Sequence, residues 1–130
     1  MALATNDFLE IGLKIGGHTK WKTHKESANV QRFKELFGVT PATCSSIWND
    51  MIGANAEDDC HIDNDANPVH FLLAVRFLFR YEREKDLARM FGTAPKTMRP
   101  WQRLYVWKLQ ALLQKKARDT SHLLSLLKRY

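Results

Sequence analysis

Residues 84–103 read EKDLARMFGTAPKTMRPWQR and carry the clearest structural pattern in the chain. Leu87 and Phe91 are four residues apart, so they share one face of a first helix. Gly92 supplies the left-handed backbone that commonly ends a helix. Pro95 suits the first position of a second helix, where its missing N–H costs little. The stretch therefore predicts two helices joined by a tight turn.

The second of these helices has an apolar face and a basic face. Met98 and Trp101 are three residues apart, and we expect both to pack on the first helix. Ala88 is small, which lets the two helices cross closely. The remaining outward positions are basic, namely Lys96, Arg99 and Arg103. This pattern is typical of a DNA-reading helix-turn-helix, whose second helix enters the major groove. The alternative is a helical hairpin with a solvated basic face.

The same signature occurs 54 residues earlier in the chain. Residues 36–44 read LFGVTPATC, and residues 90–98 read MFGTAPKTM, so Phe-Gly, Pro and Thr coincide. Phe33 then corresponds to Leu87, and Ile47 corresponds to Trp101. Two copies are too few for a stacked repeat array. We therefore predict an all-α, multi-helix domain with two helix-turn-helix-like hairpins and a long C-terminal helix.

The charge of the chain is concentrated in its C-terminal half. Residues 1–53 carry 6 basic and 5 acidic residues, and residues 54–68 carry 5 acidic residues and no basic one. Residues 69–130 carry 14 basic and 4 acidic residues, a net charge of +10. A basic excess on one part of a chain is an electrostatic footprint for a polyanion. Solubility alone is the alternative explanation.

Size and composition narrow the class of protein. A chain of 130 residues can bury one real core. It has no run of 18 apolar residues and no secretory signal pattern at its N-terminus, so we expect a protein that is neither secreted nor membrane-spanning. Two cysteines do not make a disulfide framework, and Cys44 falls at an inward position of the first hairpin. These features predict a reducing compartment, either nuclear in a eukaryote or cytoplasmic otherwise.

The first 26 residues form an N-terminal segment of mixed pattern. Ile11, Leu13 and Ile15 alternate as in a strand, whereas Phe8, Ile11 and Ile15 fit a helix, so the pattern leaves both open. Residues 18–25 form a basic, aromatic-bearing arm. Such arms can lie against phosphates or in a minor groove, although a solvated linker is the alternative. The basic side chains of this arm are Lys20, Lys22 and Lys25.

Residues 27–130 are predicted to form the helical domain. Ser27 is expected to cap a helix that ends at Phe37, and Thr40 to cap the next, which completes a first hairpin over 27–53. Residues 54–67 form an acidic loop rich in Asn and Asp, which we expect to be flexible. Residues 68–130 contain a core helix opened by Pro68, then the second hairpin.

The last helix is expected to begin near Pro95 and to continue to about Arg118. A further short amphipathic turn is predicted after it. Its apolar residues are Leu123, Leu124, Leu126 and Leu127. We expect the partner of this segment to lie outside the chain, as a catalytic domain or as a second copy of the chain.

Two segments resemble a known family. Residues 68–78, read with residues 84–107, are similar to the region that precedes the catalytic domain of Harbinger-type DDE transposases. Residues 33–48, FKELFGVTPATCSSIW, look like the same family's upstream segment. The likeness covers about residues 30–113. It implies a helix-turn-helix domain that recognises transposon ends, and carried over by position it makes Lys96, Thr97, Arg99 and Arg103 the recognition-helix contacts.

The chain departs from that family at two points. Pro100 falls inside the predicted recognition helix, where proline lacks the helical N–H and costs about 3 kcal/mol unless the helix kinks or restarts. Either the long helix starts at Pro100 after a short turn, or the domain reads DNA poorly. In addition, the metal-binding carboxylates of a DDE nuclease are not expected in this sequence, because the five acidic residues at 57–65 lie in a loop without the fold context that two-metal chemistry requires.

The sequence gives little indication of a metal site or of a catalytic site. Cys44, Cys60, His61 and His70 have no zinc-ligand spacing, so we predict no metal site and no cofactor. No serine or cysteine has an adjacent His–Asp arrangement, and no glycine-rich phosphate loop occurs. We therefore predict that this chain is not an enzyme.

The function predicted from the sequence is the binding of double-stranded DNA. Lys96, Arg99 and Arg103 are the expected base-edge contacts. The complete set of expected DNA-binding residues is Lys96, Thr97, Arg99, Arg103, Arg89, Lys108, Lys20, Lys22 and Lys25. A protein-interaction module that has kept the fold but lost DNA reading is the alternative. RNA is disfavoured because an A-form major groove does not admit a helix.

Overall fold

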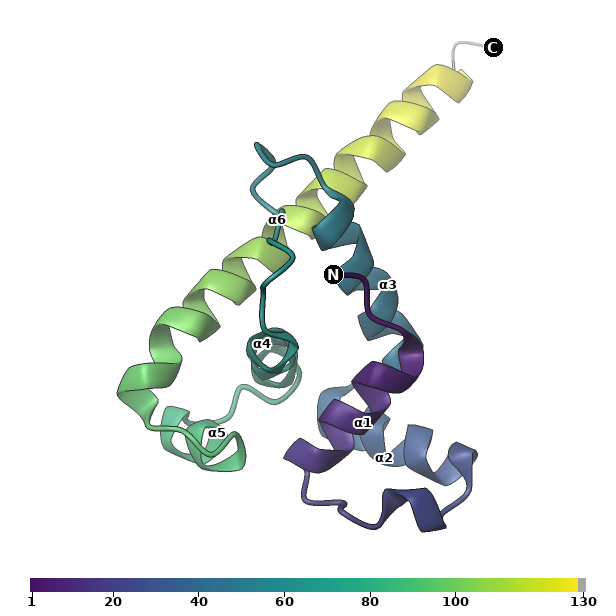
Figure 1. The fold of residues 1–130 in the computed structure, drawn as a ribbon. Coiled ribbons are helices and arrows are strands. Elements are labelled where there is room, and N and C mark those ends of the chain that lie inside the picture. The colour runs from purple at the N-terminus through teal and green to yellow at the C-terminus, as the bar shows by residue number, and fades with distance from the viewer. Residues whose placement is uncertain (129–130) are drawn as a thin grey trace.

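The computed structural model describes the backbone of residues 1–128 and the side chains of residues 1–119. It confirms the all-α fold class, and no strand occurs in the part of the chain that is described. Six α-helices and one short 3-10 helix follow one another: α1 (Thr5–Ile15), η1 (Trp21–Thr23), α2 (Glu26–Phe37), α3 (Pro41–Gly53), α4 (Pro68–Arg80), α5 (Glu84–Met90) and α6 (Pro95–Lys128). Figure 1 shows α6 as a long diagonal with α4 beneath it. Helices α1 to α3 lie on the opposite side of α4 from the start of α6.

The N-terminal segment, whose pattern left strand and helix open, forms a helix in the core. Phe8 and Leu13 of α1 are fully buried. Gly12 lies on the same side, and a Cβ at this residue would meet the Phe33 ring at 2.3 Å. The missing side chain therefore lets α1 pack directly on α2, and residues 1–15 belong to the same core as the helices that follow.

The first four residues continue this packing along α3. The Trp48 indole donates a hydrogen bond to the Met1 carbonyl at 2.9 Å, and the Ser45 hydroxyl donates to the Leu3 carbonyl at 2.6 Å. The Leu3 amide donates to the Asn49 side chain at 3.0 Å. One face of α3 is thus covered by the N-terminus of the chain.

The first hairpin, α2 and α3, has the predicted turn. Gly38 has a φ of 78°, and the Thr40 hydroxyl accepts a hydrogen bond from the Thr43 amide at 3.2 Å, with Pro41 at the first helical position. The predicted cap at Ser27 is wrong. The residue before α2 is Lys25, which makes no side-chain cap, so Ser27 lies inside the first turn, exposed to solvent.

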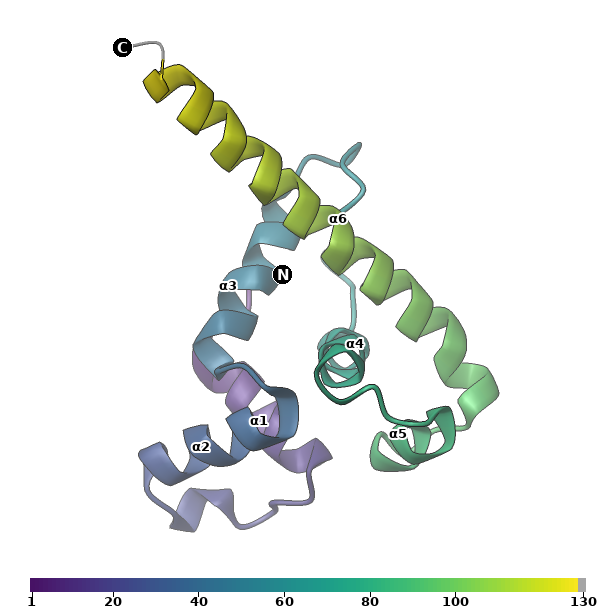
Figure 2. The ribbon, with the colours of Figure 1, turned by 180° about the vertical axis from the view of Figure 1, so that it is seen from behind.

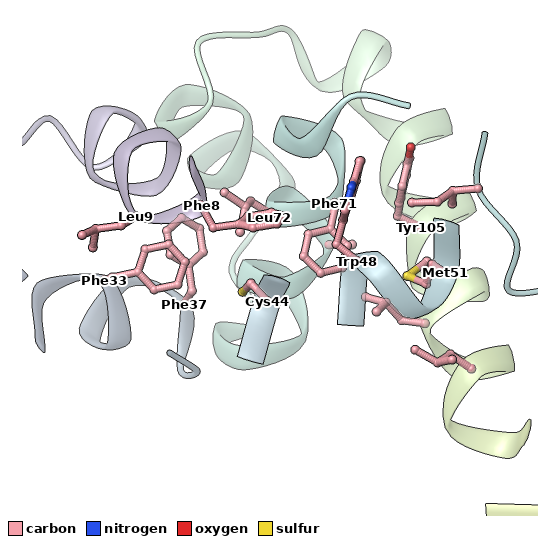
Figure 3. Close-up of a cluster of buried hydrophobic side chains, with 14 of the residues drawn as sticks. Phe8, Leu9, Phe33, Phe37, Cys44, Trp48, Met51, Phe71, Leu72 and Tyr105 are labelled. Carbon is pink, nitrogen blue, oxygen red and sulfur yellow. The ribbon is translucent and has the colours of Figure 1, made fainter. Parts of the chain in front are cut away.

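Aromatic side chains form the centre of the core, and α4 supplies its middle (Figure 3). The rings of Phe8, Trp48 and Phe71 meet edge-on, with centroids 5.6 to 5.9 Å apart. Leu72 and Ala74 of α4 are also fully buried. This confirms the prediction that the most hydrophobic helix is the central element. Because α6 packs along it, α4 positions the second hairpin against the rest of the molecule.

The last helix is longer and more continuous than the sequence predicts. It begins at Pro95, passes through Pro100 without a break and runs to Lys128, so it neither restarts at Pro100 nor ends near Arg118. Pro100 is only six residues into the helix, so its ring disturbs a turn that lies close to the helix end. The side chains of the predicted segment Leu123–Leu127 lie outside the described residues. Within the described part of the chain, no helix is long and apolar enough to cross a membrane.

Candidate nucleic-acid interface

The second hairpin consists of α5, a four-residue turn and the start of α6. Gly92 has a φ of 66°, as its place after α5 predicts. The Thr93 amide donates to the Ala88 carbonyl at 3.0 Å, which closes the end of α5. The Met98 amide donates to the Ala94 carbonyl at 3.0 Å, which opens α6. A turn of this length between two helices is typical of a helix-turn-helix.

A small apolar cluster holds the two helices together. Leu87, Ala88 and Met98 are at most 1% exposed, and they pack with Leu73 of α4. The predicted contact between Met98 and the first helix of this hairpin is therefore confirmed. The short helix α5 is fixed by α6 on one side and by α4 on the other.

Trp101 does not belong to this cluster, contrary to the expectation. Its ring stacks on His70 of α4, with centroids 3.8 Å apart and planes 18° apart. Tyr105 meets the same imidazole edge-on at 6.2 Å. Burial lowers the pKa of His70 below its ordinary value of 6.5. Trp101 thus packs α6 against α4, and Met98 makes the contact between α6 and α5.

The outer face of α6 carries the residues expected to meet DNA. Lys96, Thr97 and Arg103 are all exposed. Lys96 and Arg103 are seven residues apart and therefore lie on one side of the helix. The structure brings these residues together at the beginning of α6, as the sequence predicts.

Arg99 lies near the same helix end but is engaged within the chain. Its guanidinium forms an ion pair with the Glu84 carboxylate at the start of α5. The two side chains are 50% and 38% exposed, although the Glu84 oxygen that makes the contact is itself shielded from solvent. The sequence gives no signal for this contact, because Arg99 falls on the outward face of its helix with Lys96 and Arg103. Arg89, on the outside of α5, lies 4.0 Å from Asp86 and is 72% exposed.

Lys108 does not lie with these residues. Its ammonium donates hydrogen bonds to the His61 carbonyl and, at 3.5 Å, to the Asp59 carbonyl, so it holds the acidic loop instead of facing a groove. Two further lysines of α6 form ion pairs: Lys115 with Asp58 of the same loop at 3.0 Å, and Lys116 with Asp50 of α3 at 2.8 Å.

The acidic loop is therefore anchored, which corrects the expectation of a flexible linker. Cys60 and Ile62 are 2% and 3% exposed, and the Ile62 amide donates to the Met51 carbonyl at 3.2 Å. Cys60 and Ile62 of the loop enter the core, and the Asp58 carboxylate pairs with Lys115 of α6. One signal was present in the sequence, namely Cys60 and Ile62 among the loop's polar residues.

The basic N-terminal residues lie elsewhere. Lys20 and Lys22 belong to the short helix η1 and its start, and Lys25 precedes α2. This segment is folded, because the side-chain amide of Asn29 donates a hydrogen bond to the Trp21 carbonyl at 2.9 Å. Figure 1 shows η1 well apart from α5, so the structure does not join these lysines to the second hairpin.

The cysteines and histidines considered as metal ligands have other environments. Burial raises the pKa of the Cys44 thiol to about 12. The His61 ring lies 2.9 Å from the Ala54 carbonyl through Nδ1 and 3.3 Å from Asp63 through Nε2. Among the residues that the structure describes, no group of three or more potential ligands is placed to hold a metal ion.

A search of protein-family models, curated proteins and solved structures finds no match to this chain.

Proposed function

We propose that this chain binds double-stranded DNA, with the first two turns of α6 in the major groove. The observation that carries the proposal is the free outer face of α6. Lys96, Thr97 and Arg103 are exposed there, while the inner face is fixed by Met98. A helix held in this way can enter a groove without unfolding any core contact.

The two hairpins differ in a way that favours the second as the reader. One face of α3 is covered by residues 1–4, and its last turns carry Asp50, which pairs with Lys116. The start of α6 has no such cover, and its exposed charges are basic. Phosphate contacts by exposed lysines and arginines supply most non-specific DNA affinity.

Transposon-end recognition is the more specific form of this proposal. It rests on the resemblance of residues 30–113 to the Harbinger-type transposases, which makes Lys96, Thr97, Arg99 and Arg103 the residues that select a sequence. In a eukaryotic cell, a protein with this function would act in the nucleus.

A protein-interaction module is the second candidate, and exposed apolar side chains favour it. Leu104 and Trp107 of α6 are 45% and 49% exposed, and Leu113 is 65% exposed. Large apolar side chains exposed on one helix are common at protein interfaces.

Binding to duplex DNA, single-stranded DNA and duplex RNA of equal length separates these candidates. We expect a mobility shift with duplex DNA at the lowest protein concentration, because only a B-form major groove admits α6. Equal binding to all three polymers would mean charge attraction alone, and no binding to any of them would favour the interaction module.

A further inference from the structure

An apolar groove lies between the turn of the first hairpin, α4 and α6. Its volume is about 310 Å³, and its walls include Val39, Ile47, Phe79 and Leu113. Phe79 and Leu113 are 45% and 65% exposed, so large apolar side chains border the groove at the water interface. The Phe79 ring packs directly over Gly38, and a Cβ at this glycine would meet the ring at 2.3 Å.

The wall formed by α6 continues beyond the groove. Leu109, Leu112, Leu113 and Lys116 line it at the three- and four-residue spacing of one helical face. In the sequence, positions 120, 123 and 127 continue this spacing, and the last two are leucines. Figures 1 and 2 both show the C-terminal part of α6 extending away from the other helices. The helix that forms the groove thus carries the same apolar pattern past the body of the molecule.

We propose that the groove binds the C-terminal part of α6 from a second copy of this chain, in an antiparallel two-fold pair. With the axis between residues 117 and 118, positions 109 and 112 of one copy are level with 126 and 123 of the other. At 1.5 Å per residue, position 123 lies about 8 Å from the axis, level with Leu112 in the groove, and position 127 lies about 14 Å from it, level with residue 108 at the edge of the groove. A two-fold pair uses the same surface on both copies, so both grooves are filled at once.

Ion pairs near this axis reduce the charge repulsion between the two copies of the chain. Lys115 and Lys116 of both copies would otherwise bring four positive charges together. Each is already paired, Lys115 with Asp58 at 3.0 Å and Lys116 with Asp50 at 2.8 Å. In this register the exposed Asp119 of the second copy also comes level with Lys116, which adds an opposite charge across the interface.

The test is the molar mass of the chain by light scattering, measured without nucleic acid so that its outcome is independent of DNA binding. We expect about twice the 15.1 kDa of one chain at about 100 µM protein, where a micromolar dimer is formed. Leu113→Glu should return the mass to that of one chain. Leu104→Glu is the matched control, because Leu104 is also exposed on α6 but lies beside the acidic loop, and its mass should stay doubled.

A second pair of variants tests the occupant instead of the groove. Leu127→Glu should give a single-chain mass, whereas Ser125→Glu, about 160° away from the groove-facing line on the helix, should not. This pair decides the question even if Leu113→Glu fails to fold, which circular dichroism will show. A wild-type chain of single mass, or equal masses for Leu127→Glu and Ser125→Glu, would overturn the proposal.

Discussion

The guanidinium of Arg99 on α6 pairs with the carboxylate of Glu84 at the first residue of α5. This contact joins the two helices of the second hairpin across their turn. Both side chains are more than one third exposed, so solvent screening limits the net stability of the pair to at most about 1 kcal/mol. The pair can therefore be exchanged for a contact with a phosphate or a base at little cost to the fold.

Glu84→Gln is expected to strengthen duplex DNA binding by about threefold to tenfold, or about 0.7–1.4 kcal/mol. The substitution frees Arg99 and removes a negative charge beside the proposed interface. The measurement is fluorescence anisotropy of a labelled duplex at fixed salt.

Glu10→Gln is the matched control for this variant. Glu10 pairs with Lys14 on α1 at 3.2 Å, so the same charge is removed from an ion pair outside the second hairpin. If both variants strengthen binding equally, the effect is one of net charge and Arg99 has no role at the interface.

Ala88→Trp is expected to lower the free energy of unfolding by about 1–3 kcal/mol, because Ala88 is 1% exposed between Leu87 and Met98 and an indole cannot fit there. Thermal or denaturant unfolding measures this change. Ala28→Trp, at an exposed position of α2, should have a much smaller effect. A wild-type unfolding midpoint for Ala88→Trp would contradict the packing of the hairpin.

The local signals in the sequence were sufficient for the turns of the two hairpins. Gly38, Thr40 and Gly92 predicted where helices end and begin because each acts through its own backbone or side chain. Pairings between distant residues were not predictable in this way. Trp101 contacts His70, and Lys108 contacts the loop, because of how α4 and α6 cross. Periodicity identifies the face of a helix but not the element that the face meets.

The errors at the acidic loop and at α6 also arise from contacts between residues that are distant in the sequence. Five carboxylates in a short polar segment indicate a solvated linker when the lysines that hold the loop, Lys108 and Lys115, lie about 50 residues away. Pro100 indicated a break because propensity was weighed without the contacts around it. Met98 is buried before the proline and Trp101 stacks on His70 after it, so packing contacts hold the helix on both sides of the proline's turn.

The stack of His70 on Trp101 predicts a pH dependence of stability. The folded state lowers the pKa of His70 through burial, so below pH 6.5 the unfolded chain binds more protons than the folded one. Stability should therefore fall as the pH drops below 6.5, by at most about 1.4 kcal/mol per pH unit, and level off below the folded pKa. The free energy of unfolding of His70→Phe, measured across this pH range, should lack the part of the pH dependence that His70 contributes. His24→Phe, at an exposed position, should keep it.

Lys108→Gln and Arg103→Gln remove the same charge from α6 at positions five residues apart. We expect Arg103→Gln to weaken DNA binding and Lys108→Gln to leave it nearly unchanged, because Lys108 binds the carbonyls of the acidic loop. Lys108→Gln should instead speed hydrogen exchange of the Ile62 amide, which marks the anchored part of the loop. A larger loss of DNA affinity for Lys108→Gln would move the interface along α6.

Pro100→Lys is expected to restore the helical N–H at this position and to raise stability by up to about 3 kcal/mol. Its added charge should also tighten duplex binding if the first turns of α6 enter the groove. Pro100→Gln restores the N–H without the charge and separates the two effects. Lower stability of both variants would show that the proline is required for the start of α6.

The most direct test of DNA binding through α6 is the salt dependence of duplex affinity. A plot of log affinity against log salt has a slope of about −0.9 for each phosphate neutralised. The double variant Lys96→Ala/Arg103→Ala should flatten the slope by nearly the amount expected for two phosphates. The double variant Lys14→Ala/Lys34→Ala loses the same charge from α1 and α2 and should leave the slope unchanged. Equal slopes for the two double variants would contradict a DNA interface on the outer face of α6.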